Sequence, residues 1–177
     1  MNKNDKVLKQ ILLDVVGYKE DKVFEDLEYI QTNKKEWSPK EIETVEVYQN
    51  KSTKDFIEFT SSFINKKTQE ALFTSKLVEC NPYFYVLFTE EDPNNNGSYT
   101  YCLDICSYKI GSMIQLYYDT DENEFVLGSE NDLQFLYNPP YSEEDVYKLM
   151  VGILPPLYSY LSECNDQLNK YKANNEL

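Results

Sequence analysis

The hydrophobic positions at the start of the chain recur at the spacing of an α-helix. In residues 5–17, DKVLKQILLDVVG, apolar side chains return at steps of three and four, and Gly17 is suited to end a helix. A second segment, near residues 19–32, also places its apolar residues on one side of a helix. We therefore expect two N-terminal helices.

The next segments also contain patterns that are typical of helix starts. In WSPKEIETVEVY, Ser38 is a potential N-cap, Pro39 fits the first turn and Glu41 completes a capping box. Ser52 is expected to begin a fourth helix, because phenylalanines follow it at helical steps, at positions 56, 59 and 63.

From Tyr83 onward the pattern changes to that of β-strands. Five short segments are rich in aromatic and β-branched residues, and turn residues separate them by connections that suit antiparallel neighbours. We predict a five-stranded antiparallel meander from residues 83–89, 98–108, 112–119, 124–128 and 133–137. Residues 66–80, which precede the meander, are ambiguous; a short helix near 68–73 followed by extended chain is expected.

The last part of the chain is predicted to be helical again. Ser142 is suited to cap a helix that continues until Pro155 and Pro156 interrupt it. A final helix then places one apolar stripe on a single side, made of Leu157, Leu161, Cys164 and Leu168. The predicted fold class is α+β, in one domain over 1–177 with a helical layer (1–76), an antiparallel sheet (77–141) and C-terminal helices (142–172) that pack on one face of the sheet.

The predicted strand at 98–108 holds one acid and two of the four cysteines, which lie at 80, 102, 106 and 164. Cys102 and Cys106 would lie about 13 Å apart along a strand, too far for a disulfide, and we predict reduced thiols. Side chains alternate along a strand, so Tyr101, Leu103 and Ile105 should face the helices. Asp104 should then face solvent on the opposite side.

Composition excludes several kinds of function. The chain has no histidine and no arginine, which removes Ser-His and Cys-His nucleophile pairs and the bidentate clamp for phosphate. With 17 lysines and 31 acids the formal charge is −14, which disfavours direct binding to nucleic acid. We predict a protein that is not an enzyme and needs no cofactor. No apolar run is long enough to cross a membrane and no secretion signal is recognisable, so a cytoplasmic location is expected.

Two acidic segments match the pattern of a calcium-binding loop only in part. Residues 119–130 place Asp119, Asp121, Asn123 and Glu130 at ligand positions, but Glu124 stands where the loop needs glycine. Residues 92–103 have that glycine and end on Leu103 instead of glutamate. Both are interpreted as hairpin turns, and no metal site is predicted.

The negative charge is concentrated in the second part of the chain. Residues 1–76 have 13 lysines and 14 acids, whereas residues 77–177 have 4 lysines and 17 acids. Alternate turns of a meander lie at the same end of the sheet, so acids from several turns should form one rim there. The predicted partner-binding residues are Glu90, Glu91, Asp92, Tyr99, Asp119, Asp121, Glu122, Tyr141, Glu143, Glu144 and Asp145, with Asn94, Asn95 and Asn96 nearby.

Such a rim predicts a small acidic protein that binds a basic surface of a target protein. The predicted target is a nucleic-acid-handling protein, which the chain would inhibit by imitating the charge of nucleic acid, as a phage anti-defence or anti-CRISPR protein does. An immunity protein that neutralises a basic toxin such as a nuclease is the first alternative. A structural or homo-oligomeric subunit, in which the rim has no function, is the second. Acids that are simply solvated in turns would also explain the pattern.

Overall fold

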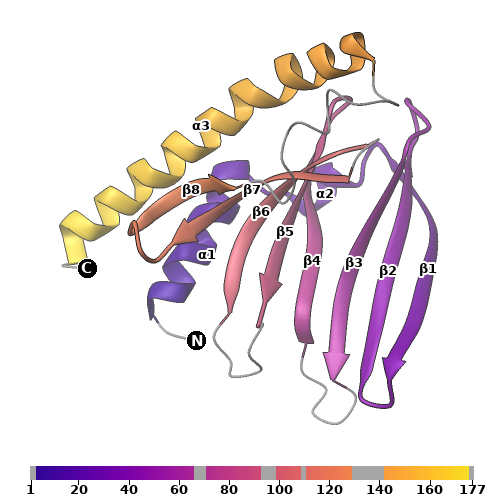
Figure 1. Ribbon diagram of the computed structural model, residues 1–177, viewed down its shortest axis with the longest axis horizontal. Helices are drawn as coiled ribbons and strands as arrows, with labels where there is room; N and C mark the ends of the chain where they lie inside the picture. The colour runs from indigo at the N-terminus through magenta and orange to yellow at the C-terminus, as the bar shows by residue number, and fades with distance from the viewer. Residues whose placement is uncertain (1–2, 66–70, 93–98, 109–110, 129–141, 176–177) are drawn as a thin grey trace.

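The part of the molecule that the structure describes is built on eight antiparallel strands that follow one another in chain order, with two helices packed on one face (Figure 1). The computed structural model describes residues 3–65, 71–92, 99–108, 111–128 and 142–175. The helices are α1 (Lys3–Val16), α2 (Glu20–Val23) and α3 (Glu143–Asn175). The strands are β1 (Leu27–Ser38), β2 (Glu41–Asn50), β3 (Phe56–Asn65), β4 (Ala71–Cys80), β5 (Tyr85–Glu91), β6 (Thr100–Ser107), β7 (Gly111–Asp119) and β8 (Glu124–Gly128).

The strands fall into a three-stranded part and a five-stranded part. Between them, the described residues of β3 and β4 form three residue pairs, Ser62↔Thr74, Phe63↔Phe73 and Ile64↔Ala71. The α+β class is therefore confirmed, and the five-stranded antiparallel part is β4–β8. The strand predicted at 133–137 lies outside the described residues. The extended chain expected before the meander is present as β4, which begins at Ala71 and so replaces the described end of the short helix expected near 68–73.

The first helix forms as its sequence predicts. Ile11, Leu12 and Val15 of α1 are buried, and Gly17 follows the helix with a φ of 62°. Its N–H donates to the Asp14 carbonyl oxygen, 3.1 Å away, which closes the end of the helix. Of the second predicted helix, only the one turn of α2 is present.

Residues 27–65, predicted largely as helices, are instead the strands β1, β2 and β3. The capping residues serve hairpin turns: the Ser38 Oγ accepts a hydrogen bond from the Lys40 N–H at 3.1 Å, in the turn between β1 and β2. At the next turn the Asn50 Oδ1 accepts from the N–H groups of Ser52 and Thr53. Serine and asparagine satisfy nearby backbone groups equally well in turns and at helix ends, which explains the wrong prediction.

The helix α3 does not break at its two prolines. Pro155 and Pro156 lack the N–H groups that would bond to carbonyls one turn earlier, yet the helix continues over 33 residues. Ile153 and Leu157, on either side of the prolines, are each 2% exposed and belong to the same core. We infer that this burial offsets the lost hydrogen bonds. The predicted stripe is confirmed: it packs on the sheet through Leu157, Leu161, Cys164 and Leu168.

The main core lies between the two long helices and one face of β4–β8. Leu103 and Ile105 of β6 face this core, as predicted, together with Leu116 of β7, and each is at most 1% exposed. A smaller core covers part of the opposite face and includes Val23, Leu27, Ile57, Phe59, Leu77, Tyr85, Leu87 and Cys106. The four cysteines are free thiols. Among the described residues, no helix is both long and apolar enough to span a membrane.

Candidate functional site

The β7–β8 hairpin separates from the β5–β6 hairpin, and a cavity lies where they part. The pairing of β6 with β7 ends at Cys102↔Tyr117, whereas β7 and β8 remain paired as far as Asp119↔Glu124. The far end of the β7–β8 hairpin is held against α3, because the Lys172 ammonium donates to the Asn123 carbonyl oxygen. In Figure 1 this hairpin turns toward α3 while β5 and β6 continue in another direction.

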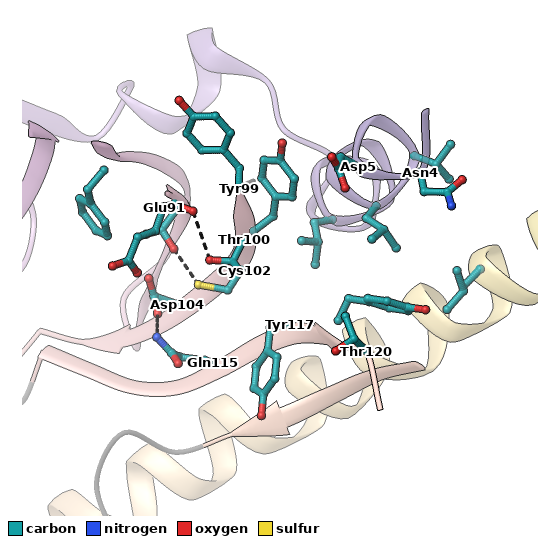
Figure 2. Close-up of a pocket in the computed structure, with 18 of the residues that line it drawn as sticks. Asn4, Asp5, Glu91, Tyr99, Thr100, Cys102, Asp104, Gln115, Tyr117 and Thr120 are labelled. Atoms are coloured by element: carbon teal, nitrogen blue, oxygen red, sulfur yellow. Dashed lines mark hydrogen bonds between the residues drawn. The ribbon is translucent and has the colours of Figure 1, made fainter. Parts of the chain in front are cut away.

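We call this space the interhairpin cavity. Its volume is about 720 Å³, within the usual range for ligand sites. The N-terminal half of α1, the strands β5–β7 and the C-terminal part of α3 contribute to its walls (Figure 2). Its apolar side chains come mostly from the helices: Val7, Leu8, Leu12 and Leu168, with Phe73 from β4.

Three carboxylates line the cavity, and no lysine is among the described residues that line it. They are Asp5 in the first turn of α1, Glu91 at the end of β5 and Asp104 in the middle of β6. Asp104 is only 8% exposed, and its Oδ1 accepts a hydrogen bond from the Gln115 Nε2 at 2.8 Å (Figure 2). The prediction that Asp104 faces solvent is therefore wrong: its side chain lies in the wall of the cavity and is bonded to β7.

Hydroxyl and thiol groups supply most of the remaining polar surface. Tyrosines at 99, 101, 117, 118 and 171 line the cavity. The Thr89 Oγ1 and the Cys102 Sγ form a hydrogen bond of 2.6 Å across β5 and β6. The Thr100 hydroxyl donates to the Glu91 carbonyl oxygen at 3.3 Å. These groups can accept or donate hydrogen bonds but add no positive charge.

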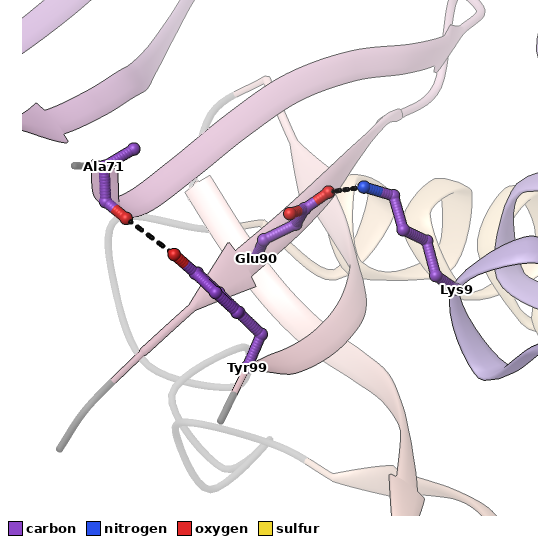
Figure 3. Close-up of polar contacts among 4 residues, drawn as sticks. All are labelled: Lys9, Ala71, Glu90 and Tyr99. Atoms are coloured by element: carbon purple, nitrogen blue, oxygen red, sulfur yellow. Dashed lines mark hydrogen bonds and ion pairs between the residues drawn. The ribbon is translucent and has the colours of Figure 1, made fainter. Parts of the chain in front are cut away.

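Negative charge near the cavity also contributes to the raised pKa of the Tyr101 phenol. Burial, and then the nearby carboxylates of Glu90 and Asp5, raise the pKa of the Tyr101 phenol to about 12. This phenol therefore stays neutral at physiological pH. Glu90 itself forms an ion pair with the Lys9 ammonium (Figure 3), so its charge is partly neutralised within the molecule.

The three predicted partner-binding acids at the end of β5 have different environments. Glu90 is paired with Lys9, and Glu91 is exposed beside the cavity. Asp92 is buried, and its backbone N–H donates to the Leu72 carbonyl oxygen at 2.8 Å. Tyr99 lies nearby, and its hydroxyl donates to the Ala71 carbonyl oxygen at 3.2 Å (Figure 3). Of these acids, Glu91 is the one that both lines the cavity and is exposed to solvent.

The acidic turn between β7 and β8 is a hairpin turn, as predicted. The Asp119 Oδ1 accepts hydrogen bonds from the N–H groups of Asp121 and Glu122, at 2.8 and 3.1 Å, and Asn123 has a φ of 56°. The side chains of Asp121 and Glu122 are exposed, and Thr120 of the same turn lines the cavity. This turn and the end of β5 therefore flank one cavity from two sides.

The single rim that was expected to include the start of α3 is not formed. Glu143 and Glu144 begin α3, whereas the β7–β8 turn contacts Lys172 near its end. The 28 residue steps from Glu144 to Lys172 correspond to about 42 Å of helix. Glu144 also pairs with Lys148 at 2.7 Å. Because α3 is continuous, it carries these acids away from the others. Tyr141 and Asn94–Asn96 lie outside the described residues, as does the side chain of Asp145.

Asp5 was not predicted as a site residue, and Asp104 was predicted to face solvent instead of the cavity. A single acid within a strongly apolar strand was the available signal for Asp104, because burial of a carboxylate is costly unless it is compensated. Asp5 offered no such signal, since an acid is common in the first turn of a helix.

Among the described residues, no group of three or more cysteine, aspartate or glutamate side chains is placed to hold a metal ion. No protein-family model, curated protein or solved structure matches the chain.

Proposed function

We propose that this protein acts by binding a basic protein, with the acids around the interhairpin cavity as the contact surface. One observation carries the proposal: the charged side chains that line the cavity, in the described part of the chain, are all carboxylates. The exposed acids Glu91, Asp121 and Glu122 stand on its two flanks. Carboxylates in and around a concave site strengthen the field there, which favours a positively charged partner and speeds its approach.

The overall charge of the chain also favours a basic protein as the partner. With a formal charge of −14, the chain attracts basic proteins over long range and repels nucleic acid. A protein surface that binds phosphates presents lysine and arginine, and carboxylates are suitable partners for both. Occupying such a surface would exclude the nucleic acid, so the proposed activity is inhibition of a nucleic-acid-handling protein without catalysis. An immunity protein against a basic nuclease would use the same contacts.

Affinity capture with charge-neutralised variants tests this proposal. The cavity variant combines Glu91→Gln, Asp121→Asn and Glu122→Gln. The control combines Glu25→Gln, Glu28→Gln and Glu58→Gln, three exposed acids outside the cavity, so both variants lose the same charge. We expect the native protein and the control to capture the same basic partner from a host lysate. The cavity variant should lose it.

The captured partner then allows a direct measurement of the proposed inhibition. Adding the native protein should displace nucleic acid from the partner, with an affinity that falls as the salt concentration rises. Equal capture by the cavity variant, or a partner with no basic surface, would show that the acids around the cavity are not the binding surface.

A further inference from the structure

The interhairpin cavity is larger and more mixed in chemistry than a surface for charge contacts alone requires. Its helical side presents apolar side chains, including Leu8, Leu12 and Leu168. Its strand side presents Glu91 and the largely buried Asp104 (Figure 2). We propose that this cavity binds an ammonium group on an apolar stem, supplied by a free organic amine or by a lysine side chain of a partner protein. This proposal rests on the proposed function for the sign of the ligand's charge.

Asp104 gives the cavity its preference for a cation. Removing a carboxylate from water is costly, and a positive charge brought close to it in a medium of low dielectric constant recovers part of that cost. Asp5 and Glu91 add two further carboxylates. The three carboxylates would repel an anion and attract a cation.

Aromatic rings add a second interaction with a cation. Tyr101, Tyr117 and Tyr118 are among the lining residues, and the face of a phenol ring attracts an ammonium group within about 6 Å. The chain already uses this contact, since the Lys9 ammonium lies 5.8 Å from the centroid of the Tyr101 ring. Tyrosine hydroxyls can also accept hydrogen bonds from an ammonium.

An ammonium needs fewer contacts from this wall of the cavity than a guanidinium does. It can bind a carboxylate through a single oxygen, so the hydrogen bond from Gln115 to the Oδ1 of Asp104 can stay in place, whereas a guanidinium binds best through both oxygens. The volume of about 720 Å³ leaves room for an apolar stem beside the leucines.

Calorimetric titration of the full chain with small probes tests the site. Hexylamine should bind, while hexan-1-ol and hexanoate, which have the same stem without the positive charge, should bind far more weakly. Asp104→Asn retains the size of the side chain and should weaken hexylamine binding by about tenfold. Glu91→Gln, at an exposed position, should weaken it without affecting folding. Asp14→Asn, an exposed acid of α1 outside the cavity, is the control and should have no effect.

A second arm identifies the source of the ammonium. A lysine-containing peptide is compared with the same peptide acetylated on the lysine side chain. Binding of hexylamine alone assigns the site to free amines, binding of the unmodified peptide alone assigns it to a partner's lysine, and binding of both supports the shared chemistry.

Equal binding of hexan-1-ol and hexylamine, no binding of either cation source, or unchanged affinity in both acid variants would overturn the proposal. Failure of the ammonium site can be distinguished from failure of the proposed function. If hexylamine binds and the captured protein does not depend on the cavity, only the choice of a protein partner is wrong. If the protein partner depends on the cavity and neither hexylamine nor the unmodified lysine peptide binds, only the ammonium site is wrong.

Discussion

The two edge strands of the described sheet differ in how they are covered. At one edge, β8 lies against α3, and the side-chain amide of Asn165 forms hydrogen bonds with both the N–H and the C=O of Phe125, at 2.8 and 2.9 Å. At the other edge, no described strand lies beyond β1, and every residue from 28 to 37 is exposed. The first edge is closed by a helix, and the second is open to solvent.

The open edge nevertheless has features that discourage uncontrolled pairing. The register of β1 against β2 shifts between Tyr29 and Gln31 and again between Glu36 and Ser38. Lys34 and Lys35 lie between these irregularities. Bulges and lysines on edge strands disfavour the addition of further strands. One edge of the sheet is therefore protected by burial under a helix, and the other by bulges and charged side chains.

The largest difference between the strands under the helices and the open strand β1 is expected in the free energy of unfolding that is lost when a hydrophobic side chain is removed. Leu116 is 0% exposed beneath α1 and α3, and Leu116→Ala should lower the free energy of unfolding by about 2–5 kcal/mol. Ile30 of β1 is 41% exposed, and Ile30→Ala should change the free energy of unfolding by no more than about 0.5 kcal/mol. Urea denaturation measures both. Similar losses in the two variants would contradict the contrast between the covered and the open strands.

Removing the side chain that closes the β8 edge should have the next largest effect. Asn165→Ala deletes two hydrogen bonds to Phe125 and should cost about 1–3 kcal/mol. The amide hydrogen of Phe125 should also exchange faster. Asn169→Ala, at an exposed position one turn further along α3, is the matched control and should leave both quantities unchanged. An unchanged exchange rate at Phe125 would show that Asn165 does not protect this edge.

The buried phenol of the helix-covered part predicts a loss of stability at alkaline pH. The folded protein raises the pKa of Tyr101 from 10.0 to about 12, first through burial and then through Glu90 and Asp5. Below pH 10 both states keep the proton. Above it the unfolded chain releases the proton before the folded protein does, so the stability from this group falls as the pH rises toward 12.

Denaturation curves of the native protein and Tyr101→Phe, compared between pH 9 and pH 12, measure this contribution. The variant should lose less stability over this interval, because it lacks the titrating group. An equal loss in both proteins would exclude Tyr101 as a source of the alkaline sensitivity.

The smallest effect is expected on the open edge. The Lys35 ammonium lies 3.7 Å from the centroid of the Trp37 ring, and Trp37 is 53% exposed. Lys35→Ala should cost about 0.5 kcal/mol and increase quenching of the Trp37 fluorescence, because the ring loses its cover. Lys34→Ala, at the neighbouring exposed position, is the control. A loss well above 1 kcal/mol would indicate that β1 is more strongly packed than its exposure suggests.

The parts of the fold that could be predicted are those where hydrophobic periodicity has one interpretation. The helix α1 and the strands β5–β8 agree with their patterns, because Leu103 and Ile105 alternate with polar residues in a run too short for a helix. The helical stripe on α3 was also evident. The predicted break of this helix at Pro155 was wrong, because burial on both sides of the prolines outweighs the low helix propensity of proline.

The segment β1–β3 could not be predicted because two periods coexist in it. Phe56 and Phe59 are three residues apart, which fits a helix, whereas the fold buries Ile57 and Phe59, two residues apart, and leaves Phe56 54% exposed. Period and turn residues alone do not decide between these interpretations. Pairing with β2 and β4 decides it, and this depends on residues distant in the sequence.

The acidity, the lack of histidine and arginine, the first helix and the later strands all follow from composition or from contacts between near neighbours in the chain. Which acids lie together depends instead on how distant segments pack. The continuous α3 carries Glu143 and Glu144 far from the β7–β8 turn, and the end of the β6–β7 pairing at Cys102↔Tyr117 opens a cavity that joins Asp5, Glu91 and Asp104. Where strands separate is set by packing over the whole sheet, which no local pattern records.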